Sequence, residues 1–174
     1  TLYPYKNYLF IGGTTGMDIF DVSSPDTIVF KSTYSHLKSC DPVIVYNDLA
    51  YVTLRGNAGC NMNNTNQLEV IDIKDVSNPQ LKKSYEMLSP YGLGLANNKL
   101  VICEGDNGLR LLEATDPMNI KTVNTITGIT PYDVIPMGND NILIMGQGDI
   151  SQYRISDMNN PVLLSKIGPF HKTN

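Results

Sequence analysis

Short apolar segments rich in β-branched and aromatic residues recur along the whole chain, separated by clusters of Asn, Asp, Gly and Pro. Runs of about four to eight such residues bounded by turn residues are typical of β-strands, and no long segment keeps a helical period. One set of four runs spans residues 42–46, 49–55, 67–73 and 80–87. The pattern therefore predicts an all-β protein built from hairpins.

The set of four runs occurs four times. An Asp-initiated turn closed by Pro follows the third run, as in "MDIFDVSSP" and "LEVIDIKDVSNP". The first runs begin near Thr1, Pro42, Gly92 and Val134, at steps of 41, 50 and 42 residues. The long step contains an inserted loop of 11 residues, 56–66.

A four-stranded repeat of about 42 residues is typical of a β-propeller, in which four-stranded antiparallel blades surround a central channel. We expect a single propeller domain or arc with four blades, at approximately residues 1–35, 36–88, 89–127 and 128–167, followed by a tail, 168–174. In each blade the Asp-to-Pro turn joins the third strand to the outermost strand, where proline limits the edge ladder. A β-sandwich with accidental internal similarity is the alternative.

The composition of the chain argues against several classes of function. Charged residues are 17% of the chain and the formal net charge is −4. The sequence lacks the basic blocks of nucleic-acid binders, so no nucleic-acid partner is expected, and its apolar runs are too short for a transmembrane helix. It also lacks a Ser/His/Asp set, a phosphate-binding glycine loop and a dinucleotide fingerprint, so we expect no catalytic residue and no cofactor.

Several stretches make the chain resemble the LVIVD-repeat family of bacterial and archaeal cell-surface proteins. They are "MDIFDVSSP", "LEVIDIKDVSNP", "SCDPVIVYNDLAYVTLRGNAGC" and "YGLGLANNKLVICEGDNGLRLLEATDP". The fourth copy, "SQYRISDMNNP", departs from the repeat because Ser156 replaces the acidic residue that ends the third strand. The resemblance implies an exported propeller at the cell surface or in the periplasm, often anchored as a lipoprotein through a region outside this chain.

Members of this family are usually longer than four blades, so the resemblance also implies that the chain is a partial propeller. Each blade buries one face against the next, and an arc of four blades would expose large apolar faces at its two ends. We expect these faces to be covered by further parts of the parent chain or by a second copy, in a homodimer that completes the ring.

The alternating direction of the strands sorts the loops onto two faces of the propeller. Links between blades and loops between second and third strands share one face, here called the long-loop face, and binding sites concentrate on such loops. We expect a protein, peptide or glycan ligand to bind there. The candidate residues are His36, Asp41, Arg55, Tyr91, Glu104, Asp106, Tyr132, Asp133 and Asp149.

No metal site is expected among these candidates. Glu104 and Asp106 could bind calcium together with backbone carbonyls, but Asp-Asn-Gly between two apolar runs is first of all a hairpin turn. His36 has no further ligands at a spacing suitable for zinc. Tyr91 and Tyr132 follow prolines at matching points of two blades, where they could form an aromatic platform or pack between the blades.

Two functional classes remain open for the long-loop face. Four carboxylates occupy equivalent rim positions and could pair in glycan hydrolysis or lysis: Asp41, Glu104, Asp133 and Asp149. A glycan-active enzyme is therefore the alternative to a non-enzymatic binding or scaffold module. The module is favoured because two of only four glutamates, Glu69 and Glu86, lie inside expected strands.

The cysteines have two expected roles. Cys40 and Cys60 lie in loops on the same face of the second blade, and we expect a disulfide between them, since export permits it and it would close a loop of about 20 residues. Two separate thiols are the alternative. Cys103 lies inside an expected strand and should be a buried, unreactive thiol.

Overall fold

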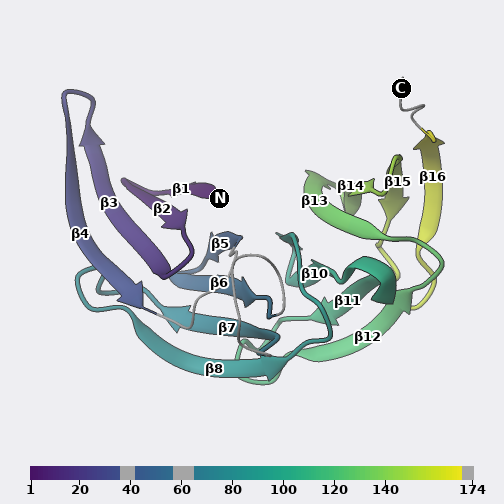
Figure 1. The fold of residues 1–174 in the computed structure, drawn as a ribbon, viewed down its shortest axis with the longest axis horizontal. Helices are drawn as coiled ribbons and strands as arrows, with labels where there is room; N and C mark the ends of the chain where they lie inside the picture. Colours follow the sequence, from purple (N-terminus) through teal and green to yellow (C-terminus); the bar gives the residue numbers. More distant parts are fainter. Residues whose placement is uncertain (36–41, 57–64, 170–174) are drawn as a thin grey trace. The chain divides into compact units, whose positions relative to one another are not determined.

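The structure, a computed structural model, describes residues 1–35, 42–56 and 65–169. The described residues form four antiparallel sheets of four strands each and one short 3-10 turn, Gly105–Asn107 (Figure 1). In every sheet the strands lie side by side in chain order. The prediction of an all-β chain made of four-stranded antiparallel blades is confirmed.

The four sheets are called blades 1 to 4. Blade 1 contains β1 (Leu2–Tyr5), β2 (Tyr8–Gly12), β3 (Gly16–Ser24) and β4 (Thr27–Ser35). Blade 2 contains β5 (Val43–Tyr46), β6 (Leu49–Leu54), β7 (Gln67–Asp72) and β8 (Gln80–Glu86). Blade 3 contains β9 (Leu93–Ala96), β10 (Lys99–Cys103), β11 (Leu109–Glu113) and β12 (Lys121–Ile126). Blade 4 contains β13 (Pro131–Gly138), β14 (Asn141–Gly146), β15 (Ile150–Arg154) and β16 (Val162–Ile167).

Many strand boundaries differ from the sequence prediction by a residue or two, and two of the differences change the local structure. In blade 4, β13 begins at Pro131 rather than at Val134, because a proline is tolerated as the first residue of a strand. In blade 1, the sequence predicts an Asp-initiated turn after the third strand, in "DVSSP", but β3 continues to Ser24, which pairs with Thr27. Pro25 therefore lies in a tight turn between two long strands.

In the other three blades an Asp side chain organises the turn before the outermost strand. The carboxylates of Asp75, Asp116 and Asp157 accept a hydrogen bond from the backbone N–H two residues further on, at 2.9–3.0 Å. The carbonyls of the same three residues accept a second bond from the backbone N–H three residues further on. This geometry is an Asx turn within a β-turn, and it explains why Asp begins each of these segments.

The first hairpins of the four blades share one backbone hydrogen bond, and three of them also share a turn type. Both turn residues have positive φ in Asn47–Asp48, Asn97–Asn98 and Asn139–Asp140, as type I′ turns require. In all four blades, the carbonyl of the second turn residue accepts a hydrogen bond from a backbone N–H near the end of the third strand or directly after it. The four pairs are Asn7–Val22, Asp48–Ile73, Asn98–Ala114 and Asp140–Ile155, at 2.8–3.0 Å.

The same register shift occurs between the third and fourth strands of all four blades. The shifts lie at Ile19/Phe20, Val70/Ile71, Leu111/Leu112 and Gln152/Tyr153. Such bulges bend a strand and increase its twist. Together with the turns, they give the four blades the same strand register, so that each residue of one blade has an equivalent in the others.

The chain divides into two compact units, each made of two blades. Unit 1 is Thr1–Pro90 and contains blades 1 and 2, whereas unit 2 is Tyr91–Asn174 and contains blades 3 and 4. Within each unit, one face of the first blade packs on one face of the second. We call these the next-blade face of the first blade and the previous-blade face of the second.

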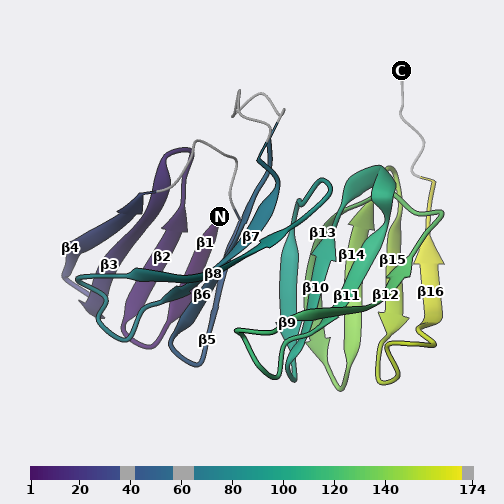
Figure 2. The same cartoon turned by 90° about the horizontal axis from the view of Figure 1, so that it is seen from below.

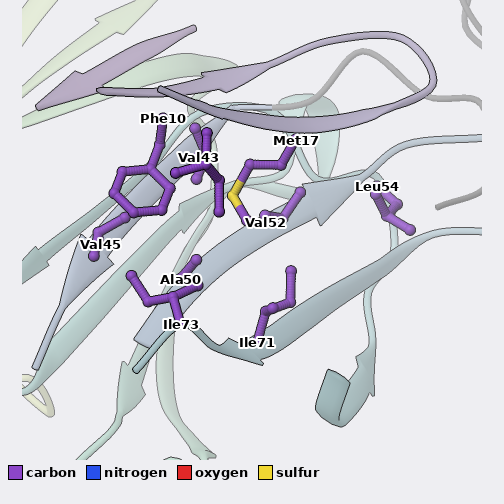
Figure 3. Close-up of a cluster of buried hydrophobic side chains, with 10 residues drawn as sticks. Phe10, Met17, Val43, Val45, Ala50, Val52, Leu54, Ile71 and Ile73 are labelled. Atoms are coloured by element: carbon purple, nitrogen blue, oxygen red, sulfur yellow. The ribbon is translucent and has the colours of Figure 1, made fainter. Parts of the chain in front are cut away.

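The core of unit 1 lies between these two faces. Phe10, Met17 and Ile19 from the next-blade face of blade 1 are fully buried. They pack against aliphatic side chains of blade 2 (Figure 3): Val43, Val45, Ala50, Val52, Leu54, Ile71 and Ile73. The cross-strand pairs Phe10–Ile19 and Val43–Val52 place each set on a single side of its sheet.

Unit 2 repeats this arrangement. Val101 and Leu111 are paired neighbours on the next-blade face of blade 3, and both are fully buried. They belong to one cluster with Val134 and Ile144, which are paired on the previous-blade face of blade 4. The inner strand β13 lies beside β9 and β10 (Figure 2).

Two kinds of polar link join the blades of each unit. In the turn link, Lys6 Nζ lies 2.5 Å from Asp48 Oδ1 in unit 1, and Lys99 Nζ lies 2.9 Å from Asp140 Oδ2 in unit 2. The lysine hydrogen bond is the main reason why the pKa of Asp48 and that of Asp140 are lowered. In both units a lysine in or next to the first hairpin turn of the first blade thus binds the first hairpin turn of the following blade.

The outer-strand link uses a side chain next to the register shift. Ser32 Oγ donates to the carbonyl of Val76 at 2.6 Å in unit 1. Asn124 Nδ2 donates to the carbonyls of Met158 and Asn159 at 3.1 and 3.0 Å in unit 2. In both units the acceptor lies in the turn that precedes the outermost strand of the following blade.

A buried carboxylate lies in the core junction of unit 1. Glu69 on β7 is 5% exposed, and its carboxylate accepts hydrogen bonds from Tyr34 Oη at 3.1 Å and Gln67 Nε2 at 2.7 Å. Burial, followed by the charge of Glu69, raises the pKa of Tyr34. The prediction that Glu69 and Glu86 lie within strands is confirmed.

We predict that Tyr34→Phe destabilises the protein by about 1–3 kcal/mol, because it removes a donor from a buried carboxylate. Tyr8→Phe is the matched control, since Tyr8 packs against the same cluster and is half-buried too. Urea unfolding followed by circular dichroism measures both changes. Equal effects of the two substitutions would contradict the assigned role of the Tyr34 hydroxyl.

We also predict a loss of stability at alkaline pH that depends on Tyr51. This side chain is 1% exposed, and burial, with smaller effects of Tyr85 and Tyr46, raises its pKa from 10.0 to about 12. The folded state favours the neutral phenol, so this contribution is full below pH 10 and is lost as pH rises toward about 12. The free energy of unfolding of Tyr51→Phe should therefore fall less steeply over this range than that of the unsubstituted protein. Parallel curves would refute the assignment.

Candidate functional site

The predicted site residues fall into three groups. His36 and Asp41 lie outside the described residues, as do Cys40 and Cys60, so the disulfide stays a prediction. Arg55 belongs to unit 1. The other six belong to unit 2: Tyr91, Glu104, Asp106, Tyr132, Asp133 and Asp149.

Loops from blades 3 and 4 meet at one end of unit 2, which we call the loop end. A Cβ on Gly105 would lie 2.9 Å from the Tyr91 ring, so the β10–β11 loop packs closely against the segment before β9. Thr130 Oγ1 donates to Asp106 Oδ1 at 3.2 Å, and the Thr130 carbonyl accepts from the N–H of Gln147 at 3.1 Å. These contacts connect the loop of blade 3 with the link into blade 4 and with its β14–β15 loop.

Tyr91 and Tyr132 form an aromatic pair at the loop end. Their ring centroids are 5.2 Å apart and the rings are inclined by 57°. The Tyr132 carbonyl accepts a hydrogen bond from the N–H of Gly92 at 2.9 Å, which fixes the two segments side by side. Tyr91 packs against the core cluster of unit 2, yet both tyrosines are only half-buried. The pair therefore packs between the blades and still presents aromatic surface.

A buried ion pair lies in the same loop. Glu104 is fully buried, and its Oε2 accepts hydrogen bonds from Arg110 Nε at 2.8 Å and Nη2 at 2.7 Å. The segment 104–108 forms a 3-10 turn, with Gly105 and Gly108 at positive φ, in place of a two-residue hairpin turn. Because the guanidinium binds the carboxylate of Glu104, this side chain serves the structure of the loop instead of offering a free calcium ligand.

Two residues that shape the loops were not among the predicted site residues. Arg110 lies in the apolar run "LRLLE", and a lone Arg there, six positions after a Glu, is a signal for a buried pair. Asn66 closes the base of the inserted loop in blade 2: its Oδ1 accepts from the N–H of Gly56, next to Arg55, and its Nδ2 donates to the carbonyl of Leu88, both at 2.8 Å. Its position at the end of a long loop gave no comparable signal.

The three described rim carboxylates each have a partner of their own. Glu104 binds Arg110, Asp149 Oδ2 lies 2.8 Å from Lys166 Nζ, and Asp133 Oδ1 accepts a hydrogen bond from the following N–H at 2.9 Å. A glycosidase needs two carboxyl groups that flank the bond to be cleaved, whereas Glu104 and Asp149 each bind a cation of their own. The arrangement favours structural roles for Glu104 and Asp149.

Other chemistry can be checked against the described part of the chain. Its His, Cys, Asp and Glu side chains form no group of three or more that could hold a metal ion. It contains no helix that is long and apolar enough to cross a membrane. Cys103 is fully buried, and burial, then the charge of Asp133, raises the pKa of its thiol. The prediction that Cys103 lies buried within a strand is confirmed, whereas its lack of reactivity stays a prediction.

The chain is similar in fold to solved structures with which it shares little sequence identity. No family model matches the chain, and no curated protein does. Among solved structures, AztD from Citrobacter koseri is 10% identical, with a TM-score of 0.66 over 94% of this chain and 45% of that chain. BamB from Moraxella catarrhalis is 14% identical, with a TM-score of 0.59 over 93% of this chain and 48% of that chain. The computationally designed protein Ika8 is 12% identical, with a TM-score of 0.67 over 98% of this chain and 48% of that chain.

AztD and BamB are β-propeller proteins. The likeness therefore identifies the four sheets as propeller blades, in place of the alternative β-sandwich. The chain spans about half the length of these structures.

We predict that Arg110→Met destabilises the protein by about 3 kcal/mol or more, because it leaves the buried carboxylate of Glu104 without its cation. The matched control is Lys166→Met, which removes the cation from the more exposed pair with Asp149 and should destabilise the protein much less, since solvent screens that pair. Chemical unfolding measures both. An Arg110→Met variant as stable as Lys166→Met would show that the ion pair does not hold the loop.

Proposed function

We propose that this chain is part of a non-enzymatic propeller that acts as a binding or scaffold module, and that its ligand binds at the loop end of unit 2. The observation that carries the proposal is the half-exposed pair Tyr91 and Tyr132, 5.2 Å apart, with Asp133 directly after it in the chain and exposed. Aromatic surface held by a rigid scaffold is a common basis of recognition.

The loop end is built to keep these groups in place. The ion pair of Glu104 with Arg110 fixes the β10–β11 loop, and the bond from Thr130 to Asp106 ties that loop to blade 4. Tyr91 is held by the core on one side and by Gly105 on the other. A preorganised surface loses little conformational entropy when a ligand binds, which favours recognition without a closing movement.

The exposed side chains at the loop end indicate which kind of ligand can bind there. Asp106 and Asp133 are exposed acceptors, while Arg110 is occupied by Glu104. A ligand with hydroxyl or ammonium donors and an apolar face for stacking fits this surface. A glycan or a segment of a peptide or protein satisfies these requirements, whereas an anionic ligand does not.

We further propose that the chain belongs to the LVIVD-repeat family and is exported to the cell surface or periplasm, with anchoring as a lipoprotein outside this chain. The four-stranded repeat with its Asp-initiated turns supports the family proposal. A glycan-active enzyme is the weaker candidate, because Glu104 and Asp149 already bind cations.

The proposal is tested by screening the chain on glycan and peptide arrays, followed by affinity measurements on any ligand found. We predict that Tyr132→Ala weakens binding at least tenfold, a loss of about 1.4 kcal/mol. Tyr46→Ala is the control, since Tyr46 is a 41% exposed tyrosine of unit 1 and should leave the affinity unchanged. Arrays without a ligand, or equal effects of the two substitutions, would refute the site. Release of a shortened glycan would favour the enzyme instead.

A further inference from the structure

Blade 4 has an apolar face that the described residues leave uncovered. Ile135 on β13 is paired with Leu143 on β14, and Met145 is paired with Ile150 on β15, so these side chains share one side of the sheet. Ile135 is 55% and Met145 is 52% exposed. Together with Asp133 they line a hollow of about 190 Å³. An apolar hollow exposed to solvent is typical of a surface that binds a partner.

The strand register identifies this side as the next-blade face of blade 4. Leu143 is the third residue of β14, as Phe10 is of β2 and Val101 is of β10. Phe10 and Val101 are fully buried because the following blade of their unit covers them. The exposed face of blade 4 therefore has the position and composition of a surface made to pack against another blade.

The polar links of blade 4 also lack their acceptor blade. Asn141 is the first residue of β14 and so stands where Lys99, the first residue of β10, makes the turn link. The Oδ1 atom of Asn141 is buried and has no hydrogen-bond partner among the described residues. Ser165 stands next to the register shift, as Ser32 and Asn124 do, but within the described part of the chain its hydroxyl reaches only Gln152 Oε1, at 3.4 Å.

Blade 1 of the same chain carries the complementary surface. Leu2 is paired with Ile11, and Phe20 is paired with Leu9 and Phe30, all on the side of the sheet opposite to Phe10. Leu2 is 65% and Phe30 is 56% exposed. This side corresponds to the previous-blade faces of blades 2 and 4. In its first turn, Asn7 stands where Asp48 and Asp140 accept the turn link.

We propose that a second copy of this chain docks here, with the previous-blade face of its blade 1 on the next-blade face of blade 4. The amide of Asn7 from the second copy supplies the donor that Asn141 Oδ1 lacks.

The contact joins two different surfaces, so each copy offers one of each and two copies can form two identical junctions. Such a dimer contains eight blades, within the range of about four to eight that propellers use. Tyr91 and Tyr132 lie outside this contact, whereas Asp133 lines the hollow and is shared with the loop end.

The experiment measures the mass of the 174-residue chain in solution by light scattering over a series of concentrations. We expect twice the mass of one chain, which is 19.2 kDa. Ile135→Asp on blade 4 and Leu2→Asp on blade 1 should each give a folded monomer, as judged by circular dichroism. Met118→Asp is the control, since Met118 is 40% exposed in a turn of blade 3 and should leave the dimer intact.

Mixing the two monomeric variants tests the pairing of unlike faces. Ile135→Asp keeps an intact blade 1 and Leu2→Asp keeps an intact blade 4, so the mixture should form a dimer through one junction. A monomeric unsubstituted chain would overturn the proposal. So would a dimer that resists both substitutions, or one that is sensitive only to Ile135→Asp, since a contact between two blade 4 faces would explain that result.

Discussion

The structure depends on the fact that a propeller blade has two apolar faces and cannot bury either one alone. In β6 the residues Ala50 and Val52 point to one side, Tyr51 and Thr53 to the other, and all four are buried. The outermost strand is different, because every residue of β16 is exposed. Apolar faces without a partner cost about 25 cal/mol for each Å² left in water. Blades are therefore stable in stacks, and the stacking decides where every loop lies.

The polar links add direction to this non-directional packing. The turn and outer-strand links of unit 1 join residues 42 and 44 positions apart, Lys6 with Asp48 and Ser32 with Val76, which is about the length of one repeat. One link lies at the first hairpin and the other at the turn before the outermost strand, so they hold two separated points of the neighbouring sheet. Apolar packing tolerates small slips between sheets, whereas two hydrogen-bonded points with fixed geometry do not.

The sequence predicts the strands and turns well because these follow local rules. Alternating apolar runs mark the strands, and Asn-Asp pairs such as Asn47–Asp48 mark turns that need positive φ. The candidate site could be predicted only in part. Tyr91 and Tyr132 were found from their matching positions, but the partner of Glu104 depends on how a 3-10 turn directs the side chain of Arg110. Such a contact is set by three-dimensional packing, on which the local pattern carries little information.

The candidate site and the blade junction of unit 2 are physically one structure. Tyr91 belongs both to the aromatic pair and to the surroundings of the core that joins blades 3 and 4. Asp106 and Thr130, from different blades, are hydrogen-bonded across the same junction. A ligand that binds only when the two blades are packed stabilises that packing by its binding free energy. The binding of such a ligand at the loop end and the packing of blades 3 and 4 would therefore be coupled.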